Sequence, residues 1–170
     1  MELKRISPNK LTLRPFYTLD KQWALLTAGD RARFNTMTVS WGGLGTLWNK
    51  PVATVYVRPQ RYTYEFTERN EYFTLSFFGG NFMDDLQYLG SHSGRDEKKL
   101  SKTCLTPAFD AETAAPYIAE ASCVLVLRKL YHDDIKPERF DDSSIIDSVY
   151  PAHDFHRVYI CEVIAAYAKN

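Results

Sequence analysis

Six runs of β-branched and aromatic residues, several alternating between apolar and polar positions, constrain the fold of this chain most strongly. A period of two is typical of strands. The expected strands lie near 22–28, 33–41, 52–58, 72–78, 122–131 and 157–167. Many strands at short spacing, with few long helices, predict a mainly β fold in which an antiparallel sheet forms a closed or nearly closed barrel.

Turn and helix signals separate these strands. Gly29 and Asp30 predict a tight hairpin between the first two strands, and 49–51 (Asn-Lys-Pro) breaks the chain before the third. Short helical segments are expected over 61–69, 82–89 and 96–100. Asn81 is a good N-cap for the second of these. The prolines in 135–154 predict a loop there, with room for one helical turn.

Composition excludes several classes of protein. The chain has 170 residues, which predicts a single domain over 1–170, and its 21 basic and 21 acidic residues balance. A balanced charge without a basic stripe argues against a nucleic-acid partner. No apolar run approaches the roughly 20 residues that span a bilayer, and the N-terminus has no secretory signal. We therefore expect a cytoplasmic protein with no membrane partner.

The three cysteines and four histidines give no sign of a metal site. Cys104, Cys123 and Cys161 are odd in number and match neither a disulfide framework nor a zinc pattern. Cys123 and Cys161 lie in apolar, strand-like runs, where buried inert thiols are expected. The histidines do not fall at ligand spacings on a predicted helix. The sequence predicts no resident metal.

The segment 35–48 combines a polar strand with glycines. Phe34, Thr36, Thr38 and Ser40 would share one face of the strand, with Asn35, Met37, Val39 and Trp41 on the other. The strand then runs into 42–45, which reads as a glycine-rich turn. Such a polar edge with exposed backbone suits hydrogen bonding to a flat heteroaromatic ligand. An ordinary strand and hairpin turn is the alternative.

Two segments could bind an anion. Arg58 ends a predicted strand, and Arg61 with Thr63 opens a predicted helix, so two guanidinium groups and free helix N–H groups would meet in one corner suited to phosphate. A solvated pair of surface arginines is the alternative. The second segment is 91–99, whose Ser-Gly turn can form an amide-lined concavity; an exposed loop is equally compatible with it.

No local pattern supplies a protein nucleophile or a dinucleotide fold. There is no Gly-x-Ser-x-Gly elbow, no phosphate loop of the Walker type and no strand–GxGxxG–helix unit. A ligand pocket without a nucleophile is expected where a bound cofactor performs the chemistry. We therefore assign no catalytic residue.

Taken together, these segments resemble the flavin reductase-like family, whose members adopt the FMN-binding split-barrel fold. The motifs that carry the resemblance run in order along 35–42, 48–51, 57–63, 71–76, 89–96 and 156–163. They place the core of the domain at about 21–168. The resemblance implies a split β-barrel, antiparallel and Greek-key-like, with a few short helices. Cys161 departs from the pattern, since it replaces a glycine of the closing strand.

The resemblance also implies a set of FMN-binding residues. The isoalloxazine ring would lie against the strand that carries Asn35, Thr36, Met37, Thr38, Ser40 and Trp41. The phosphate would be held by Arg58, Arg61, Tyr62 and Thr63. A loop with Ser93, Gly94 and either Lys98 or Lys99 would close over the flavin, and His156 would lie near the ring.

The implied activity is that of an NAD(P)H-dependent flavin reductase, in which a nicotinamide stacks on the flavin and passes hydride to flavin N5. Family members usually pair as homodimers with the flavin near the subunit boundary. One alternative is an FMN-bound electron carrier that a partner protein feeds, without direct NAD(P)H oxidation, and that passes electrons to an acceptor protein. Another is a small barrel that serves as a binding module without redox chemistry.

Overall fold

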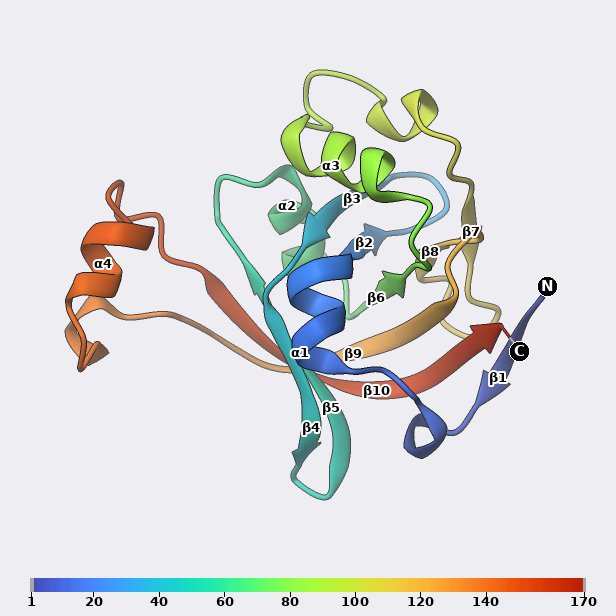
Figure 1. Cartoon of the computed structure of the whole chain (residues 1–170), viewed down its shortest axis with the longest axis horizontal. Coiled ribbons are helices and arrows are strands. Elements are labelled where there is room, and N and C mark those ends of the chain that lie inside the picture. The colour runs from blue at the N-terminus through green and yellow to red at the C-terminus, as the bar shows by residue number, and fades with distance from the viewer. Residues whose placement is uncertain (1, 170) are drawn as a thin grey trace.

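The computed structural model describes residues 2–169, and one bent antiparallel sheet forms its body (Figure 1). Its strands are β1 Leu3–Ile6, β2 Ala24–Gly29, β3 Phe34–Val39, β4 Gly42–Leu47, β5 Lys50–Val57, β6 Tyr72–Phe77, β9 Cys123–Asp134 and β10 Arg157–Lys169. They lie in the order β3-β2-β6-β9-β10-β5-β4, and β1 pairs with the end of β10. A separate hairpin contains β7 Pro107–Phe109 and β8 Pro116–Ile118.

All six predicted strands are present, and the predicted hairpin joins β2 to β3. Gly29 takes φ +131°, which an L side chain rarely adopts, and a Cβ there would lie 2.4 Å from the carbonyl oxygen of Arg33. The Asp30 carboxylate accepts hydrogen bonds from the backbone N–H groups of Ala32 and Arg33, both at 2.8 Å. Gly29 and Asp30, on which the hairpin prediction rested, therefore specify the turn.

The sheet is open between β3 and β4, which are the two ends of the strand path. Only Ser40 and Trp41 connect them, yet the two strands do not pair. The prediction of a glycine-rich turn at 42–45 is wrong, because this segment is strand β4 and pairs along its whole length with β5. The turn lies instead at Trp48 and Asn49, which have φ of +52° and +57°.

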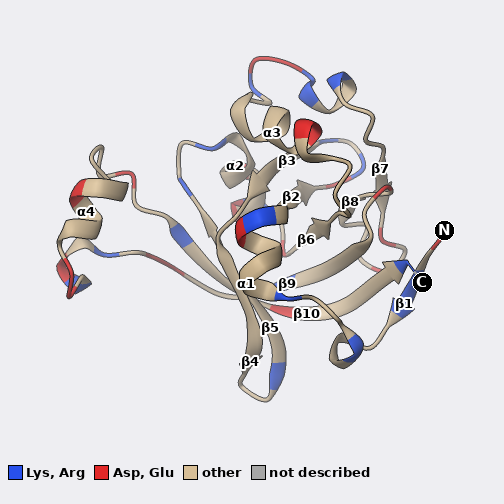
Figure 2. Ribbon diagram, viewed as in Figure 1, with Lys and Arg blue, Asp and Glu red and all other residues tan. Residues whose placement is uncertain are grey.

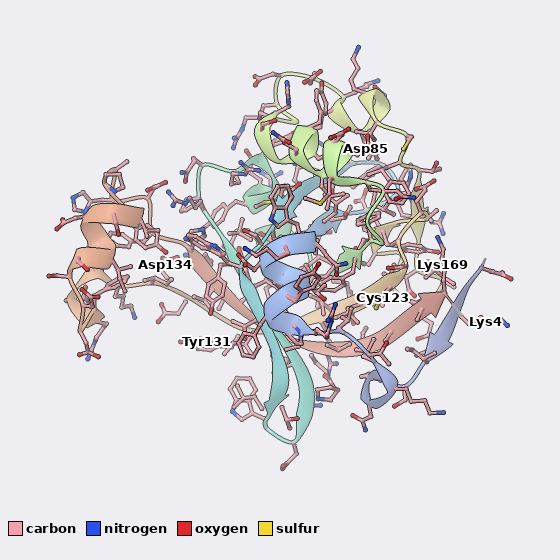
Figure 3. All side chains as sticks on the ribbon, viewed as in Figure 1. Lys4, Asp85, Cys123, Tyr131, Asp134 and Lys169 are labelled. Carbon is pink, nitrogen blue, oxygen red and sulfur yellow. The ribbon has the colours of Figure 1, made fainter. Side chains whose placement is uncertain are left out.

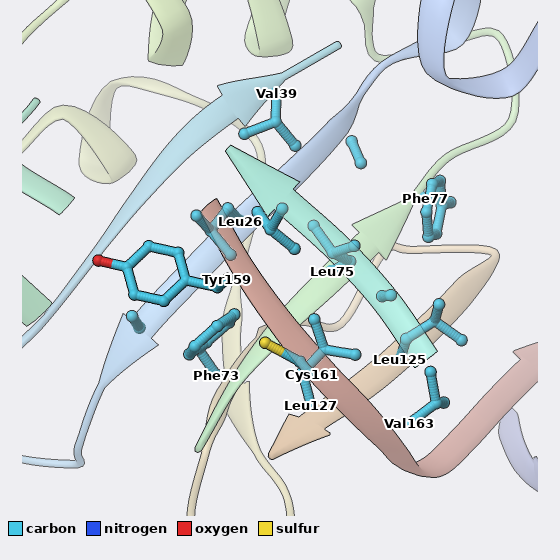
Figure 4. Close-up of a cluster of buried hydrophobic side chains, with 14 of the residues drawn as sticks. Leu26, Val39, Phe73, Leu75, Phe77, Leu125, Leu127, Tyr159, Cys161 and Val163 are labelled. Carbon is cyan, nitrogen blue, oxygen red and sulfur yellow. The ribbon is translucent and has the colours of Figure 1, made fainter. Parts of the chain in front are cut away.

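The interior of the sheet is filled by large apolar side chains from six strands (Figure 4). Phe73 and Tyr159 pack edge to face with ring centroids 5.9 Å apart, and both are fully buried. Cys123 and Cys161 belong to this core, as predicted, while Cys104 is exposed. The Cys161 thiol is fully buried, so the side chain that replaces the family's glycine is accommodated inside the barrel.

The helices are short; α2 and α3 lie at one end of the sheet, whereas α4 lies apart from them (Figure 1). Their bounds are η1 Pro8–Lys10, α1 Pro15–Tyr17, η2 Thr18–Gln22, α2 Tyr62–Arg69, α3 Met83–Ser91, η3 Lys99–Lys102, η4 Pro137–Arg139 and α4 Ser144–Val149. The predicted N-cap is wrong, because Phe82 occupies that position and no side chain caps α3. The turn predicted at 96–100 forms later, as η3. No helix within residues 2–169 has the length and hydropathy needed to cross a membrane.

Residues 135–156, here called the arm, connect β9 to β10 and project away from the barrel (Figure 1). The arm contains η4 and α4, so the predicted loop with a helical turn is confirmed and includes one further turn. Acidic residues lie next to α4 (Figure 2). Figure 3 shows Tyr131 and Asp134 on β9, where the chain leaves the sheet.

Candidate functional site

Two adjoining cavities lie beside β3, α2 and α3. The wide cavity, of about 410 Å³, is lined by Trp23, Met37, Thr38, Val39, Ser40, Trp41, Tyr56, Arg58, Arg61, Leu86, Gln87, Gly90, Ser91 and His156. The polar cavity, of about 230 Å³, is lined by Asn35, Met37, Gln60, Arg61, Tyr62, Thr63, Ser91, His92, Ser93, Gly94 and Lys99. Met37, Arg61 and Ser91 line both, so the two cavities lie side by side with a shared wall.

The polar cavity lies at the first turn of α2. Arg61 has extended backbone and precedes the helix, and no side chain caps the helix there. The N–H groups of Tyr62 and Thr63 consequently have no hydrogen-bond partner among residues 2–169. Free N–H groups at the positive end of a helix favour an anion.

Two cations without a carboxylate partner face this helix end. Arg61 is half-buried and donates to the carbonyl oxygen of Gly90 at 2.7 Å. Lys99 is buried and donates from Nζ to the carbonyl oxygens of Leu89 at 2.6 Å and His92 at 2.9 Å. In the part of the chain that the structure describes, neither cation forms an ion pair.

The electrostatics of the pair follow from this arrangement. Burial, and then the charge of Arg61, lowers the pKa of Lys99 to about 8, while Glu97 acts in the opposite direction. Burial, and then the charge of Arg58, lowers the pKa of Arg61. Buried like charges without a counter-ion are unfavourable. A bound anion would relieve this cost, so the polar cavity is suited to a phosphate-like group.

Gly94 forms part of the wall of the polar cavity by close approach to β3. A Cβ on Gly94 would lie 2.1 Å from Asn35 Oδ1 and 3.1 Å from Tyr62 Cδ1. Asn35 is itself fixed, because its Nδ2 donates to Thr63 Oγ1 at 2.9 Å. The predicted Ser-Gly turn thus lies against α2 and β3, and only glycine fits there without displacing a neighbour.

The wide cavity lies between the end of β3 and α3. Met37 and Val39 face the barrel core, while the Thr38 hydroxyl on the other face donates to the carbonyl oxygen of Leu86 on α3. Since β3 is the last strand of the sheet, one side of its backbone has no strand neighbour. Trp41, about half exposed, lies at the rim. An apolar space beside a free strand edge suits a flat ring.

His156 is buried on the rim of the wide cavity, just before β10. Its ring packs against Trp41, with ring centroids 5.2 Å apart, and its Nδ1 lies 2.8 Å from the Tyr150 hydroxyl. Burial, and then the positive charge of Arg58, lowers the pKa of His156 to about 4, while Asp154 acts in the opposite direction. The imidazole is therefore neutral at pH 7.

Arg58 does not share the environment of Arg61. Its guanidinium forms an ion pair with Asp154, donates to the carbonyl oxygen of Val149 at 2.9 Å and packs over the Tyr150 ring at 5.2 Å. All three partners belong to the arm. The expectation of two arginines in one phosphate corner is corrected: Arg58 lines the wide cavity, and Arg61 alone of the two reaches the polar cavity.

The structure brings most of the predicted site residues together. The predicted residues in the polar cavity are Asn35, Tyr62, Thr63, Ser93, Gly94 and Lys99. Those in the wide cavity are Thr38, Ser40, Trp41, Arg58 and His156. Met37 and Arg61 line both cavities. Thr36 and Lys98 line neither and border a surface cleft that shares Asn35, Tyr62, Gly94 and Lys99 with the polar cavity. The Thr36 hydroxyl is committed to Thr27 at 3.0 Å and to the carbonyl oxygen of Leu26 at 3.3 Å.

Several lining residues were missed by sequence reasoning. Ser91 and His92 belong to the segment that the Ser-Gly turn had marked, so the motif could have included them. Leu86, Gln87 and Trp23 carried no local signal, because the packing of α3 against β3 brings the first two to the wide cavity and the pairing of β2 with β3 brings Trp23 there. Within residues 2–169, no group of three or more His, Cys, Asp or Glu side chains could hold a metal ion.

Comparison of the sequence with protein families identifies the family of this chain. The sequence model of the flavin reductase like domain matches residues 16–170. This chain belongs to the flavin reductase-like family. A comparison with curated proteins gives no match.

Solved structures share the family's fold at low sequence identity. Flavoredoxin from Methanosarcina acetivorans is 22% identical with a TM-score of 0.67, over 88% of this chain and 69% of that one. An FMN-binding domain of a flavin reductases-like enzyme from Shewanella baltica is 19% identical with a TM-score of 0.70, over 99% and 78%. A Shewanella frigidimarina protein described as having a split barrel domain is 18% identical with a TM-score of 0.69, over 95% and 77%. The predicted split-barrel fold is confirmed.

Proposed function

We propose that this protein binds FMN and works as an NAD(P)H-dependent flavin reductase. One observation carries the proposal: a largely apolar cavity beside a free strand edge adjoins a polar cavity that contains two cations without a carboxylate partner among the described residues. FMN has the matching order of groups, a flat ring joined through a flexible chain to a phosphate. The family, an FMN-binding one, supports the same ligand.

The polar cavity would hold the phosphate. Arg61 and Lys99 would supply charge, and the free N–H groups of Tyr62 and Thr63 would donate hydrogen bonds. Thr63 also accepts from Asn35, and this bond fixes its hydroxyl against β3. The donor set is cationic and polar with no carboxylate on the cavity wall, which fits a phosphate dianion.

The wide cavity would hold the ring. Trp23 and Leu86 give it apolar walls, and the edge of β3 offers backbone groups to the polar rim of a ring. When bound, flavin supplies the capacity to accept hydride and pass electrons onward. The chain's own contribution is orientation, and burial with the charge of Arg58 lowers the pKa of His156, so this wall of the cavity presents a neutral imidazole.

A groove beside the wide cavity could admit the second substrate. Ser40, Trp41 and Tyr56 line both spaces, and the groove, of about 600 Å³, continues past Phe16 and Leu44. Its walls are largely apolar and aromatic, which suits stacking of a nicotinamide. The same opening would serve a diffusible acceptor of the electrons.

The deciding experiment is an anaerobic titration of FMN-loaded protein with NADH and then with NADPH, followed by visible absorption. We expect the flavin band to bleach with one of them. A flavin band that neither NADH nor NADPH bleaches, but that a chemical reductant does bleach, would favour the electron carrier fed by a partner protein. Protein that takes up no FMN and gains no thermal stability from it would leave only the binding module.

We also propose that two copies pair through the face around β4. Trp41, Leu47 and Trp48 are exposed there, and a Cβ on Gly43 or Gly45 would meet nothing within 4 Å. Gly45→Arg is expected to convert a dimer into a monomer in analytical ultracentrifugation. Gly80→Arg is the matched control, because Gly80 also faces open space but lies away from β4. A dimer that survives the first change would contradict this assignment.

The cysteines support a reducing compartment, which we propose is the cytoplasm. All three thiols are free, and the exposed Cys104 donates to the Asp85 carboxylate at 2.9 Å. Unpaired, exposed thiols are unusual in oxidising surroundings.

A further inference from the structure

A buried hydrogen bond joins His156 to Tyr150 at the base of the arm, and no sequence motif pointed to Tyr150. Tyr150 follows α4 and is 4% exposed, and His156 precedes β10 and is 8% exposed. The Tyr150 hydroxyl oxygen lies 2.8 Å from His156 Nδ1. His156 also lines the wide cavity. This contact, together with the bonds of Arg58 to Asp154 and Val149, joins the arm to the wall of the wide cavity.

The direction of this bond follows from hydrogen-bond satisfaction. The Tyr150 hydroxyl has no other partner among residues 2–169. If Nδ1–H donated to it, the buried phenolic hydrogen would be left without an acceptor, which is unfavourable. Tyr150 therefore donates and Nδ1 accepts. A neutral imidazole carries one N–H, so the proton of His156 resides on Nε2.

The surroundings keep the imidazole neutral. Trp41, Tyr56 and Tyr150 pack around the ring, and the nearest charged groups are Arg58 and Asp154, which are paired with each other. Burial and Arg58 both disfavour a charged imidazole. Nε2 forms no hydrogen bond within the described part of the chain. It remains available to a ligand.

We propose that the arm, through Tyr150, fixes His156 as an Nε2–H donor to the wide cavity, where it donates a hydrogen bond to an acceptor atom on the edge of the flavin ring. The role of the ligand rests on the proposed function, whereas the tautomer does not. His156 is then a ring-binding residue and Tyr150 a positioning residue. A donor here favours rings that present a carbonyl oxygen or an unprotonated nitrogen.

The first test needs no flavin. A proton–nitrogen correlation NMR spectrum of nitrogen-labelled protein identifies the tautomer of His156 directly. We expect the neutral Nε2–H form from about pH 8 to about pH 5. Tyr150→Phe should give a mixture of tautomers and a raised pKa of His156, because the donor to Nδ1 is lost. An Nδ1–H tautomer in the wild-type protein, or no change in the variant, would overturn the proposal.

The second test concerns the ligand. His156→Leu should weaken FMN binding about tenfold in a fluorescence titration, and His156→Gln, which retains an N–H group near the position of Nε2, should recover most of the loss. Tyr131→Phe is the control, because Tyr131 is exposed on β9 and contacts neither cavity. If wild-type protein binds no FMN, the proposed function fails while the tautomer result stands. If the wild-type protein binds FMN and both His156 variants bind it as tightly as the wild type does, the proposed contact between His156 and the ring is wrong.

Discussion

Arg58 and Arg61 stand three residues apart at the junction of β5 and α2, yet the structure gives them opposite surroundings. Arg58 is enclosed by an aspartate, a carbonyl oxygen and an aromatic ring of the arm. Arg61 has one carbonyl oxygen and a neighbouring lysine, Lys99, of the same charge. A cation whose partners lie within the protein stabilises the fold, whereas a half-buried cation without a counter-ion is available to a ligand.

The same contrast extends to the walls around the two arginines. On the arm side, the Tyr150 hydroxyl is bonded to His156 Nδ1, and Asp154 Oδ2 pairs with Arg58, although Asp154 Oδ1 is buried without a partner among the described residues. In the polar cavity, within residues 2–169, two helix N–H groups have no hydrogen-bond partner, and two cations bond to carbonyl oxygens but form no ion pair. Unsatisfied polar groups that converge on one cavity indicate where an anion binds, while satisfied ones indicate where the structure is held together.

Arg61→Ala should produce the largest effect. We expect FMN affinity to fall roughly 100-fold, since a charge-assisted contact to the phosphate contributes about 1.5–3 kcal/mol. The melting temperature of the apoprotein should change little, because the substitution also removes repulsion with Lys99. Fluorescence titration and thermal unfolding measure the two quantities. An FMN affinity equal to that of the wild type would show that Arg61, like Arg58, does not bind the phosphate.

Gly94→Ala tests the wall of the polar cavity. The new Cβ would overlap Asn35 Oδ1, so we expect FMN affinity to fall about tenfold and the free energy of unfolding by ~1–3 kcal/mol. Gly80→Ala is the control, because its Cβ would meet nothing within 4 Å. Equal behaviour of the two variants in both assays would show that Asn35 moves aside freely.

The pH dependence of FMN binding tests Lys99. Its pKa of about 8 without an anion would rise when phosphate binds, so binding takes up a proton wherever the free amine is neutral. Affinity should therefore be full at about pH 7, begin to fall near pH 8 and decrease above it by at most about tenfold per pH unit. Lys99→Met should remove this dependence in titrations from about pH 7 to about pH 9.5. A wild-type affinity that stays constant over that range would exclude Lys99 from the phosphate site.

Arg58→Ala should give the smallest change in binding and a change in stability instead. We expect FMN affinity within about threefold of wild type and a free energy of unfolding lower by ~1 kcal/mol. Arg58 holds the pKa of Asp154 below its usual range, so the stability from this pair is present at neutral pH and lost as the pH falls below about 4. Urea unfolding of the wild type and the variant, at neutral pH and below about pH 4, measures this loss of stability. A large loss of FMN affinity would return Arg58 to the phosphate site.

The family motifs and the alternating strands were legible in the sequence, because both depend on neighbours in the chain. Period-two runs predicted β2, β3, β5, β6, β9 and β10, and Gly29 with Asp30 predicted the first hairpin. The start of α2 was also local, since proline and a polar first turn mark it. Most of the predicted site residues line the two cavities for the same reason: they lie within those motifs.

Only the tertiary structure decided which charges are available and which are paired. Asp154 lies 96 residues beyond Arg58, so no local pattern relates them. Lys98 and Lys99 are adjacent and chemically equal, but η3 buries Lys99 against the end of α3 and leaves Lys98 exposed. Glycines 42–45 suggested a turn, and they form a strand because β5 pairs with them. Sequence specifies local conformation through steric preference, whereas burial and charge pairing depend on segments that meet only after folding.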